Sequence, residues 1–302
     1  MLGIHYWAFL LPIVTTGLWL CDVIGLLALW SRDGFAQYQV DDASFVFISD
    51  VGAQHKTWFI IFSVLTAIFF IATMSSERYL RSMRRIPGSI RRRQTVYDIC
   101  CLVFAAMGGL FLSLLSGFDA VSFSNLHWSC TLLFIVCTGI SVLFQILELF
   151  SLSHHYNPSI KHLKWNAVLK SFLLIFAVCI LITFIGLYAE CHGDAPTYNT
   201  NTKCDHIVSG AATMEWICAF LLTFFFSSIT IDVWPRNYYG KQEAMAAKQA
   251  EKHGQDPEVA AAEAHNQFNN VDPYQMPQDG YGTVNSAMPP SLHQAPLCEA
   301  NQ

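Results

Sequence analysis

Charged residues are scarce in this chain. Only 13% of its 302 residues are Asp, Glu, Lys or Arg, whereas 53% are hydrophobic and 14% are aromatic. Soluble domains carry about a quarter charged residues, so this composition excludes an ordinary soluble globular protein. Together with a mean hydropathy of +0.37, it indicates a polytopic membrane protein.

The chain also lacks the short motifs of several enzyme and transporter classes. It contains no P-loop, dinucleotide fingerprint, HExxH zinc motif or nucleophile elbow. No pair of Gly- or Pro-interrupted apolar runs indicates the broken helices of a transporter, and no polar rings indicate a channel pore. We therefore expect a non-enzymatic protein with no cofactor, no metal site and no nucleic-acid partner.

Six apolar runs are long enough to cross a membrane as helices, which takes about 20 residues each. Seven of the eight tryptophans fall near the ends of these runs, where an amphipathic ring prefers the headgroup region. From about residue 240 the chain has too little apolar material for a core, so we expect a mostly disordered cytoplasmic tail over 240–302, with transient helix over 242–253. The predicted fold is an all-α transmembrane domain over 1–239, with spans at 7–30, 57–74, 97–117, 127–150, 165–188 and 212–234.

The basic residues set the orientation of these spans. Seven of the seventeen Lys and Arg residues lie within the sixteen positions from Arg78 to Arg93, between the second and third spans. Since positive charge accumulates on cytoplasmic loops, this segment and both termini are predicted to be cytoplasmic. Lys161, Lys164 and Lys170 then also belong to the cytoplasmic side.

The same arginines indicate a ligand. Each basic residue near an anionic leaflet contributes about 1 kcal/mol, and four to eight beside a span are typical of binding to phosphatidylserine or phosphoinositides. Arginine also makes bidentate contacts to phosphate that lysine cannot make, and the segment contains no lysine. The alternative is that the loop only enforces topology. The predicted anionic-lipid-binding residues are Arg78, Arg81, Arg84, Arg85, Arg91, Arg92 and Arg93.

A second group of ionisable residues falls at the opposite, outer level of the predicted spans. Such groups are costly in a membrane and are functional candidates for that reason. They could form a structural or headgroup-facing cluster, a ligand pocket or a catalytic site, and the structural reading is favoured. This outer polar cluster comprises Asp22, Asp50, Asp119, His127 and Glu215. Glu148 and Asp232, near the inner interface, are expected to pair with the cationic loops.

Two of the ten cysteines are candidates for a disulfide. Cys191 and Cys204 lie in the last outer loop, on the oxidising side of a secretory-pathway membrane, whereas most of the others lie within spans. A bond between them would close a loop of about 14 residues, which is worth on the order of 3 kcal/mol in the chain-entropy model.

Three segments resemble one family. They read FVFISDVGA over 45–53, FDAVSFSNLHWSCTLLF over 118–134 and EWICAFLLTFFFSSITIDVWP over 215–235. With the topology, they resemble the DRAM/Frag/Sfk family of six-span membrane proteins, and within it the fungal Sfk (suppressor of four kinase) branch. The resemblance marks Asp50, His127 and Glu215 as family-typical positions without assigning them a reaction.

The resemblance implies three different functions. Sfk-like members support recruitment of phosphatidylinositol 4-kinase and lipid organisation at the plasma membrane. DRAM-like members modulate autophagy in lysosomal membranes, and related proteins remodel the lipid of GPI anchors in the endoplasmic reticulum and Golgi. Since phosphoinositides lie on the cytoplasmic leaflet, the arginine segment favours a plasma-membrane protein that engages anionic lipids and a lipid-kinase complex. The outer polar cluster would favour a role in GPI-anchor remodelling.

Overall fold

The computed structural model describes residues 7–40, 42–83, 86, 92–155, 161–191, 202–234, 247–248, 250–251, 254 and 256–269. Six of its helices are long and apolar enough to span a membrane, which confirms the predicted all-α six-span fold. They are α2 (Leu10–Arg32), α4 (Lys56–Ser82), α5 (Arg92–Gly117), α6 (Ser124–His155), α7 (Lys161–Cys191) and α8 (Thr202–Val233). Two shorter helices are α3 (Ile48–Gln54) and α10 (Pro257–Asn269).

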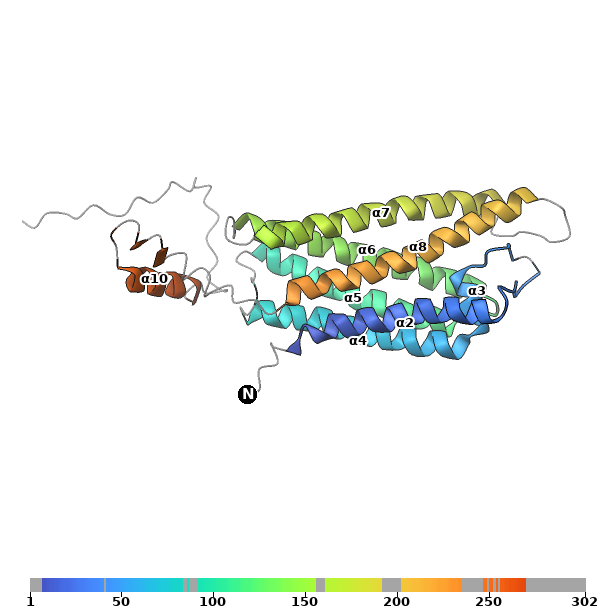
Figure 1. Cartoon of the computed structure of the whole chain (residues 1–302), viewed down its shortest axis with the longest axis horizontal. Coiled ribbons are helices and arrows are strands. Elements are labelled where there is room, and N and C mark those ends of the chain that lie inside the picture. The colour runs from blue at the N-terminus through green and yellow to red at the C-terminus, as the bar shows by residue number, and fades with distance from the viewer. Residues whose placement is uncertain are drawn as a thin grey trace, which may run out of the picture.

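The six long helices form a closed ring in chain order (Figure 1). Each one packs on the next, and α8 returns to pack on α2. The short helix α3 contacts α2, α4 and α8 at one end of the bundle, which we call the outer end. The opposite end carries the start of α5 and the end of α8, and by the arginine distribution it is the cytoplasmic end. Long-range contacts between α2 and α8 therefore hold the two ends of the transmembrane domain together.

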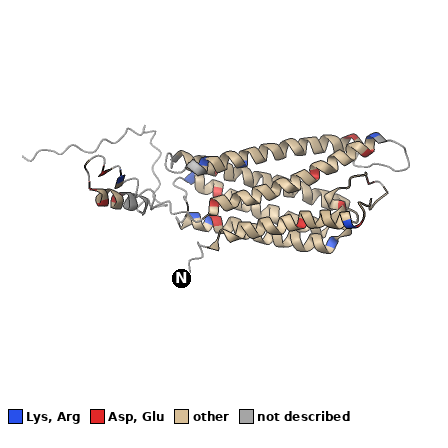
Figure 2. Ribbon diagram, viewed as in Figure 1, with Lys and Arg blue, Asp and Glu red and all other residues tan. Residues whose placement is uncertain are grey.

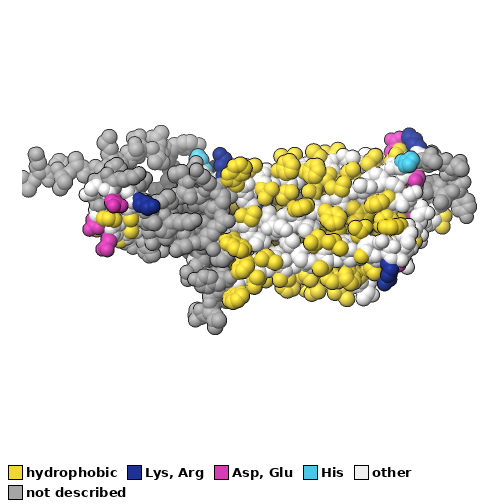
Figure 3. Space-filling view, in the orientation of Figure 1, with side chains coloured by type: hydrophobic (Ala, Val, Ile, Leu, Met, Phe, Trp, Pro, Cys, Tyr) yellow, Lys and Arg dark blue, Asp and Glu magenta, His cyan; other side chains and the backbone are white. Residues whose placement is uncertain are grey.

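Charge is segregated along the bundle. Lys, Arg, Asp and Glu gather toward its two ends (Figure 2), and the middle presents a broad hydrophobic surface (Figure 3). Helix α7 is the span least covered by the rest of the protein, because only 6% of its most apolar stretch is buried. Phe172, Ile175 and Ile182 each leave more than half of their surface uncovered. A surface of this kind suits hydrocarbon rather than water.

Two helix boundaries differ most from the predicted spans, for physical reasons. Helix α4 continues to Ser82 instead of ending near 74, since the extra turns bury Glu77 and Arg81 as an ion pair. Helix α8 starts at Thr202 instead of 212, and its added first turns carry polar residues beyond the apolar run. Hydropathy detects the hydrocarbon-crossing part of a helix and misses such polar extensions.

The tail contains a helix beyond the segment in which one was expected. Helix α10 begins at Pro257, where Asp256 Oδ1 accepts a hydrogen bond of 2.9 Å from the backbone N–H of Glu258. An acidic cap followed by proline at the first helical position is a favourable start for a helix. In the segment 242–253, where the Ala/Glu/Lys composition predicted transient helix, the described residues 247–248 and 250–251 are also helical.

Candidate functional site

Glu215 fastens α3 to α8. Its Oε2 accepts a hydrogen bond of 3.0 Å from the backbone N–H of Ile48, and its carboxylate also accepts bonds from the backbone and side chain of Ser49. These are the first residues of α3, whose N–H groups have no partner within the helix. A carboxylate is favourable there because the helix dipole places partial positive charge at the N-terminus. Glu215 therefore acts as the cap of α3.

Asp50 lies in the first turn of the same helix and is 8% exposed. It accepts hydrogen bonds from the backbone N–H of Phe47 and, over 3.3 Å, from Gln39 Nε2. Burial, with the negative charge of Asp42 nearby, raises the pKa of Asp50 to about 7. A substantial fraction of Asp50 is thus protonated at neutral pH, and the residue stabilises the outer loop.

Asp119 has a different role, in the turn between α5 and α6. Its Oδ2 lies 2.8 Å from Lys56 Nζ, at the start of α4. Its Oδ1 accepts a hydrogen bond from the backbone N–H of Ser122, and these two donors hold the pKa of Asp119 well below its usual range. Asp119 therefore remains ionised and ties the turn to α4.

One ring nitrogen of His127, Nδ1, forms hydrogen bonds within the protein, whereas the other, Nε2, forms none among the described residues. Its Nδ1 lies 3.0 Å from the carbonyl oxygen of Leu115 and 2.8 Å from that of Phe118. Carbonyl oxygens only accept hydrogen bonds, so Nδ1 must carry the proton. In the neutral ring, Nε2 is then an unprotonated acceptor, and no hydrogen bond to it occurs among the described residues. The side chain is oriented by the turn that precedes α6.

Asp22 stands apart from the other four residues of the outer polar cluster. It is 1% exposed and lies on the seam between α2 and α4, where Ser63 Oγ donates a hydrogen bond of 3.0 Å to its Oδ2. The sequence predicted one shared outer level for all five residues. The structure instead places Asp22 well inside the span of α2, paired to a neighbouring helix.

A cavity of about 310 Å³ lies between the outer halves of α6, α7 and α8. Two residues of the outer polar cluster, His127 and Glu215, line it, whereas Asp22, Asp50 and Asp119 do not. The remaining wall is mostly apolar. It consists of Ser49, Trp128, Ser129, Thr131, Leu132, Ile135, Ile180, Leu181, Phe184, Ile185, Met214 and Cys218.

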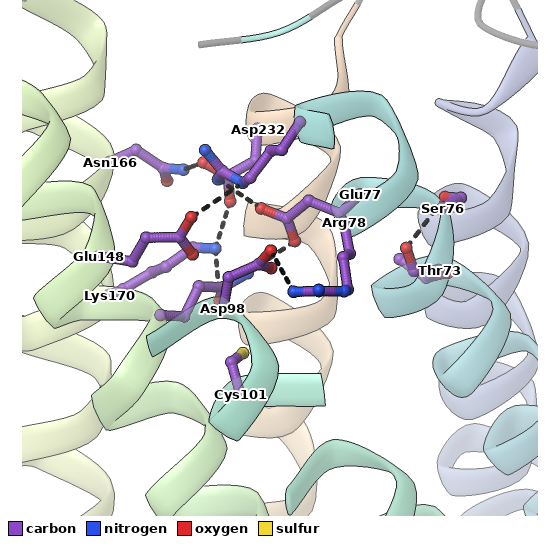
Figure 4. A network of polar contacts seen from close by, with 12 residues as sticks. Thr73, Ser76, Glu77, Arg78, Asp98, Cys101, Glu148, Asn166, Lys170 and Asp232 are labelled. Carbon is purple, nitrogen blue, oxygen red and sulfur yellow. Dashed lines mark hydrogen bonds and ion pairs between the residues drawn. The ribbon is translucent and has the colours of Figure 1, made fainter. Parts of the chain in front are cut away.

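At the cytoplasmic end, two of the seven predicted lipid-binding arginines are engaged within the protein. Figure 4 shows one of them, Arg78, beside Asp98. Arg81 is 3% exposed, and its guanidinium lies 2.6 Å from Glu77 and 3.4 Å from Glu148. Arg78 forms an ion pair of 2.8 Å with Asp98 of α5. Since α4 stays helical through both arginines, it directs them to neighbouring helices instead of the loop.

The other five arginines are placed differently. Arg92 and Arg93 are exposed in the first turn of α5. Arg84, Arg85 and Arg91 lie outside the described residues. The side chains of Arg92 and Arg93 are therefore accessible at the surface of the protein, whereas that of Arg81 is buried within it.

A buried polar network continues from these arginines across the bundle (Figure 4). Gln145 Nε2 donates a hydrogen bond of 3.0 Å to Glu77, and Lys170 Nζ donates one of 2.7 Å to Gln145 Oε1. Lys170 also forms an ion pair with Asp232, which accepts a further hydrogen bond from Asn166. The network joins α4, α6, α7 and α8 in the centre of the ring.

The sequence reading partly anticipated this network. Glu148 and Asp232 were expected to pair with cationic loops, and both do have cationic partners, but these partners come from within helices. Lys170 was counted among the cytoplasmic basic residues, although it is fully buried. The sequence did contain an indication that Lys170 is buried, because Lys170 lies inside an apolar helix, one turn after Asn166.

The outer end is also fastened covalently. The structure joins Cys191, at the end of α7, to Cys204, near the start of α8, in the expected disulfide. Seven further cysteines among the described residues are free thiols. Within these same parts of the chain, no three His, Cys, Asp or Glu side chains gather as a metal site would require.

Comparisons with known proteins agree with this architecture. The chain is 26% identical over 238 residues to "Protein sfk1" of Schizosaccharomyces pombe, an alignment that covers 78% of this chain and 67% of the relative. No solved structure matches. The family model described as "Frag1/DRAM/Sfk1/Cwh43P N-terminal domain" matches residues 7–236, which include all six spans, and the chain therefore belongs to this Frag1/DRAM/Sfk1 family of multi-span membrane proteins.

Proposed function

We propose that this chain is a non-enzymatic plasma-membrane protein that organises lipids and supports recruitment of a phosphatidylinositol 4-kinase at its cytoplasmic face. The observation that carries the proposal is the arginine segment 78–93, whose first residues belong to the end of α4 and whose last residues belong to the start of α5. Arg78 and Arg81 tie its first part to neighbouring helices, and Arg92 and Arg93 are exposed where α5 begins.

Arg92 and Arg93 would give the cytoplasmic face a cationic surface beside the membrane. Each exposed arginine there attracts anionic lipid by about 1 kcal/mol. The planar guanidinium also makes paired hydrogen bonds to phosphate oxygens, which favours phosphorylated headgroups. Such a surface would concentrate phosphoinositides at the protein, and a kinase complex that acts on the same leaflet would find its substrate there.

The test is the plasma-membrane signal of a fluorescent phosphatidylinositol 4-phosphate reporter in cells that lack this protein. We expect a lower signal, restored by the wild-type chain and not by a chain carrying both Arg92→Gln and Arg93→Gln. The matched control is Arg32→Gln, because the Arg32 side chain is 71% exposed at the outer end. Accessibility of the tail to antibody before and after permeabilisation would verify that neutralisation has not inverted the topology.

Equal rescue by the double variant and the wild-type chain would remove the arginines from the mechanism. An unchanged reporter signal in cells without the protein would reject the kinase role altogether.

A second candidate function is participation in the remodelling of GPI-anchor lipids from the outer side. The observation that favours it is His127, whose unoccupied Nε2 belongs to a ring that lines the outer cavity. An imidazole with a free ring nitrogen can accept a proton from a bound molecule. Loss of normal anchor lipids in cells carrying His127→Ala, with the variant still at its usual membrane, would support this role over the first.

A further inference from the structure

The outer cavity opens sideways, toward the lipid. Leu132 of α6 and Ile185 of α7 form part of its wall and are 56% and 54% exposed. Both helices are membrane spans, so this exposed rim faces hydrocarbon instead of water. A molecule could therefore enter the cavity from the membrane, between α6 and α7.

The shape and lining of the cavity restrict its occupant. Ligand pockets usually have volumes of about 300–1,000 Å³, and the cavity, at about 310 Å³, lies at the small end of this range. It can hold part of one hydrocarbon chain, but not both chains of a phospholipid. The wall is mainly aliphatic and aromatic, and no Lys or Arg belongs to the part of it that the structure describes. A phosphate inside would thus have no cation as a partner.

Two polar atoms of residues that line the cavity have no hydrogen-bond partner within the part of the chain that the structure describes. His127 Nε2 is an acceptor, because the backbone carbonyls of Leu115 and Phe118 hold the proton on Nδ1. Thr131, one turn further along α6, has a buried hydroxyl with no partner. Leaving a buried polar atom without a partner costs about 1–3 kcal/mol. A ligand with a neutral hydroxyl would donate to Nε2 and accept from the Thr131 hydroxyl.

We propose that this cavity binds one acyl chain of a neutral, hydroxyl-bearing lipid from the outer leaflet, with the lipid hydroxyl hydrogen-bonded to His127 Nε2. A monoacylglycerol has this chemistry. Glu215 does not compete for the hydroxyl, because its carboxylate is engaged by the start of α3. The inference concerns the outer face and does not rest on the cytoplasmic role proposed above.

The experiment uses the purified full chain in phosphatidylcholine nanodiscs, with a monoacylglycerol that carries a photoreactive diazirine in its acyl chain. After irradiation, mass spectrometry of the peptides locates the attachment. We expect cross-links on the outer halves of α6, α7 and α8, and competition by unlabelled monoacylglycerol. Cross-links spread over the lipid-facing surface, without enrichment at the cavity, would overturn the proposal on the wild-type protein alone.

Two variants of α6 test whether the cavity is the site. Ile135→Trp places a large ring in the cavity and should abolish the enriched cross-links. The neighbouring Val136→Trp is the matched control, since Val136 is 44% exposed and does not line the cavity. Equal labelling of the two variants would reject the cavity as the binding site. Thermal unfolding of both would identify a variant that fails to fold, in which case the wild-type map decides.

A third comparison tests the hydroxyl. The same probe with its hydroxyls methylated can no longer donate a hydrogen bond, and we expect it to bind about 3- to 10-fold more weakly, the value of one neutral hydrogen bond. His127→Phe should remove the difference between the two probes. Equal binding of both probes to the wild-type chain would reject the proposed contact with His127. Stronger labelling by a photoreactive sterol would reject the acyl chain as the occupant.

Discussion

Lys170 of α7 and Asp232 of α8 form an ion pair in the centre of the helix ring, where their side chains are 0% and 1% exposed. The ammonium group also donates to Gln145 and lies 5.7 Å from the ring centroid of Phe225. A buried charge needs a partner of opposite charge. The free energy of transferring an isolated ion out of water is far larger than the free energy that one hydrogen bond recovers.

Removing one partner of the Lys170–Asp232 ion pair should therefore destabilise the protein strongly. We expect Lys170→Met to lower the free energy of unfolding by about 3–5 kcal/mol, the usual result of leaving one charge of a buried pair uncompensated. Adding Asp232→Asn should recover part of the loss, since it removes that charge and keeps an acceptor for Asn166. The measurement is unfolding by SDS titration in detergent micelles.

The control for this prediction lies on the same helix. Lys164 is exposed, so Lys164→Met should change the free energy of unfolding by less than about 0.5 kcal/mol. Equal effects of the Lys164 and Lys170 substitutions would mean that the buried pair does not stabilise the bundle.

This pair also marks the limit of what the sequence predicted. The six spans were predictable because hydropathy along about 20 residues is a local property. The ion pair joins positions 62 residues apart, and Glu215 caps a helix whose first residue is 167 positions away. Local pattern could place His127 and Glu215 at the outer end, but only the packing of α6, α7 and α8 brings them to one cavity.

The same reasoning explains the arginines. Their number and position were enough to predict the cytoplasmic side, because topology depends on the sum of charges. Which arginines remain accessible depends on where α4 ends, and this helix continues through Arg78 and Arg81 because Asp98, Glu77 and Glu148 neutralise them.

Two glycines of α2 should respond oppositely to the same substitution. A Cβ at Gly25 would lie 2.4 Å from the ring of Trp58, whereas a Cβ at Gly17 meets nothing within 4 Å. We expect Gly25→Ala to destabilise the protein by about 1–3 kcal/mol, since α2 and α4 must separate or the indole must turn. Gly17→Ala should be neutral or stabilise by up to about 1 kcal/mol, because alanine favours the helix. Thermal unfolding in one detergent compares them, and similar midpoints would contradict the close α2–α4 contact.

The disulfide offers a prediction at the outer end. Replacing Cys191 and Cys204 by serine should lower the free energy of unfolding by about 3 kcal/mol, the value for a loop of this length in the chain-entropy model. In the wild-type chain denatured in SDS, alkylation without reductant should leave these two cysteines unmodified and label free cysteines such as Cys21 and Cys179. Mass spectrometry of the peptides shows which cysteines are alkylated. Labelling of all four to the same extent would show that the bond is absent.

The pH dependence of stability should carry the signature of Asp50. Its pKa rises from an ordinary 3.8 to about 7 in the folded protein, because burial and the charge of Asp42 favour the neutral acid. The folded state thus binds this proton more tightly than the unfolded state. The stabilisation from Asp50 is complete below about pH 4 and is lost as the pH rises through 7.

We expect the wild-type protein to lose up to about 1.4 kcal/mol of stability per pH unit from this group as the pH is raised from 5 to 7. Asp50→Asn, which mimics the protonated acid, should lack that component of the slope. Asp119→Asn is the control: with the pKa of Asp119 lowered by Lys56, its stabilisation is lost only in acid, so the slope between pH 5 and 7 should match the wild type. Unfolding midpoints at four pH values would separate the three proteins. Parallel curves for the wild type and Asp50→Asn would show that Asp50 already carries its charge in the folded state at pH 5.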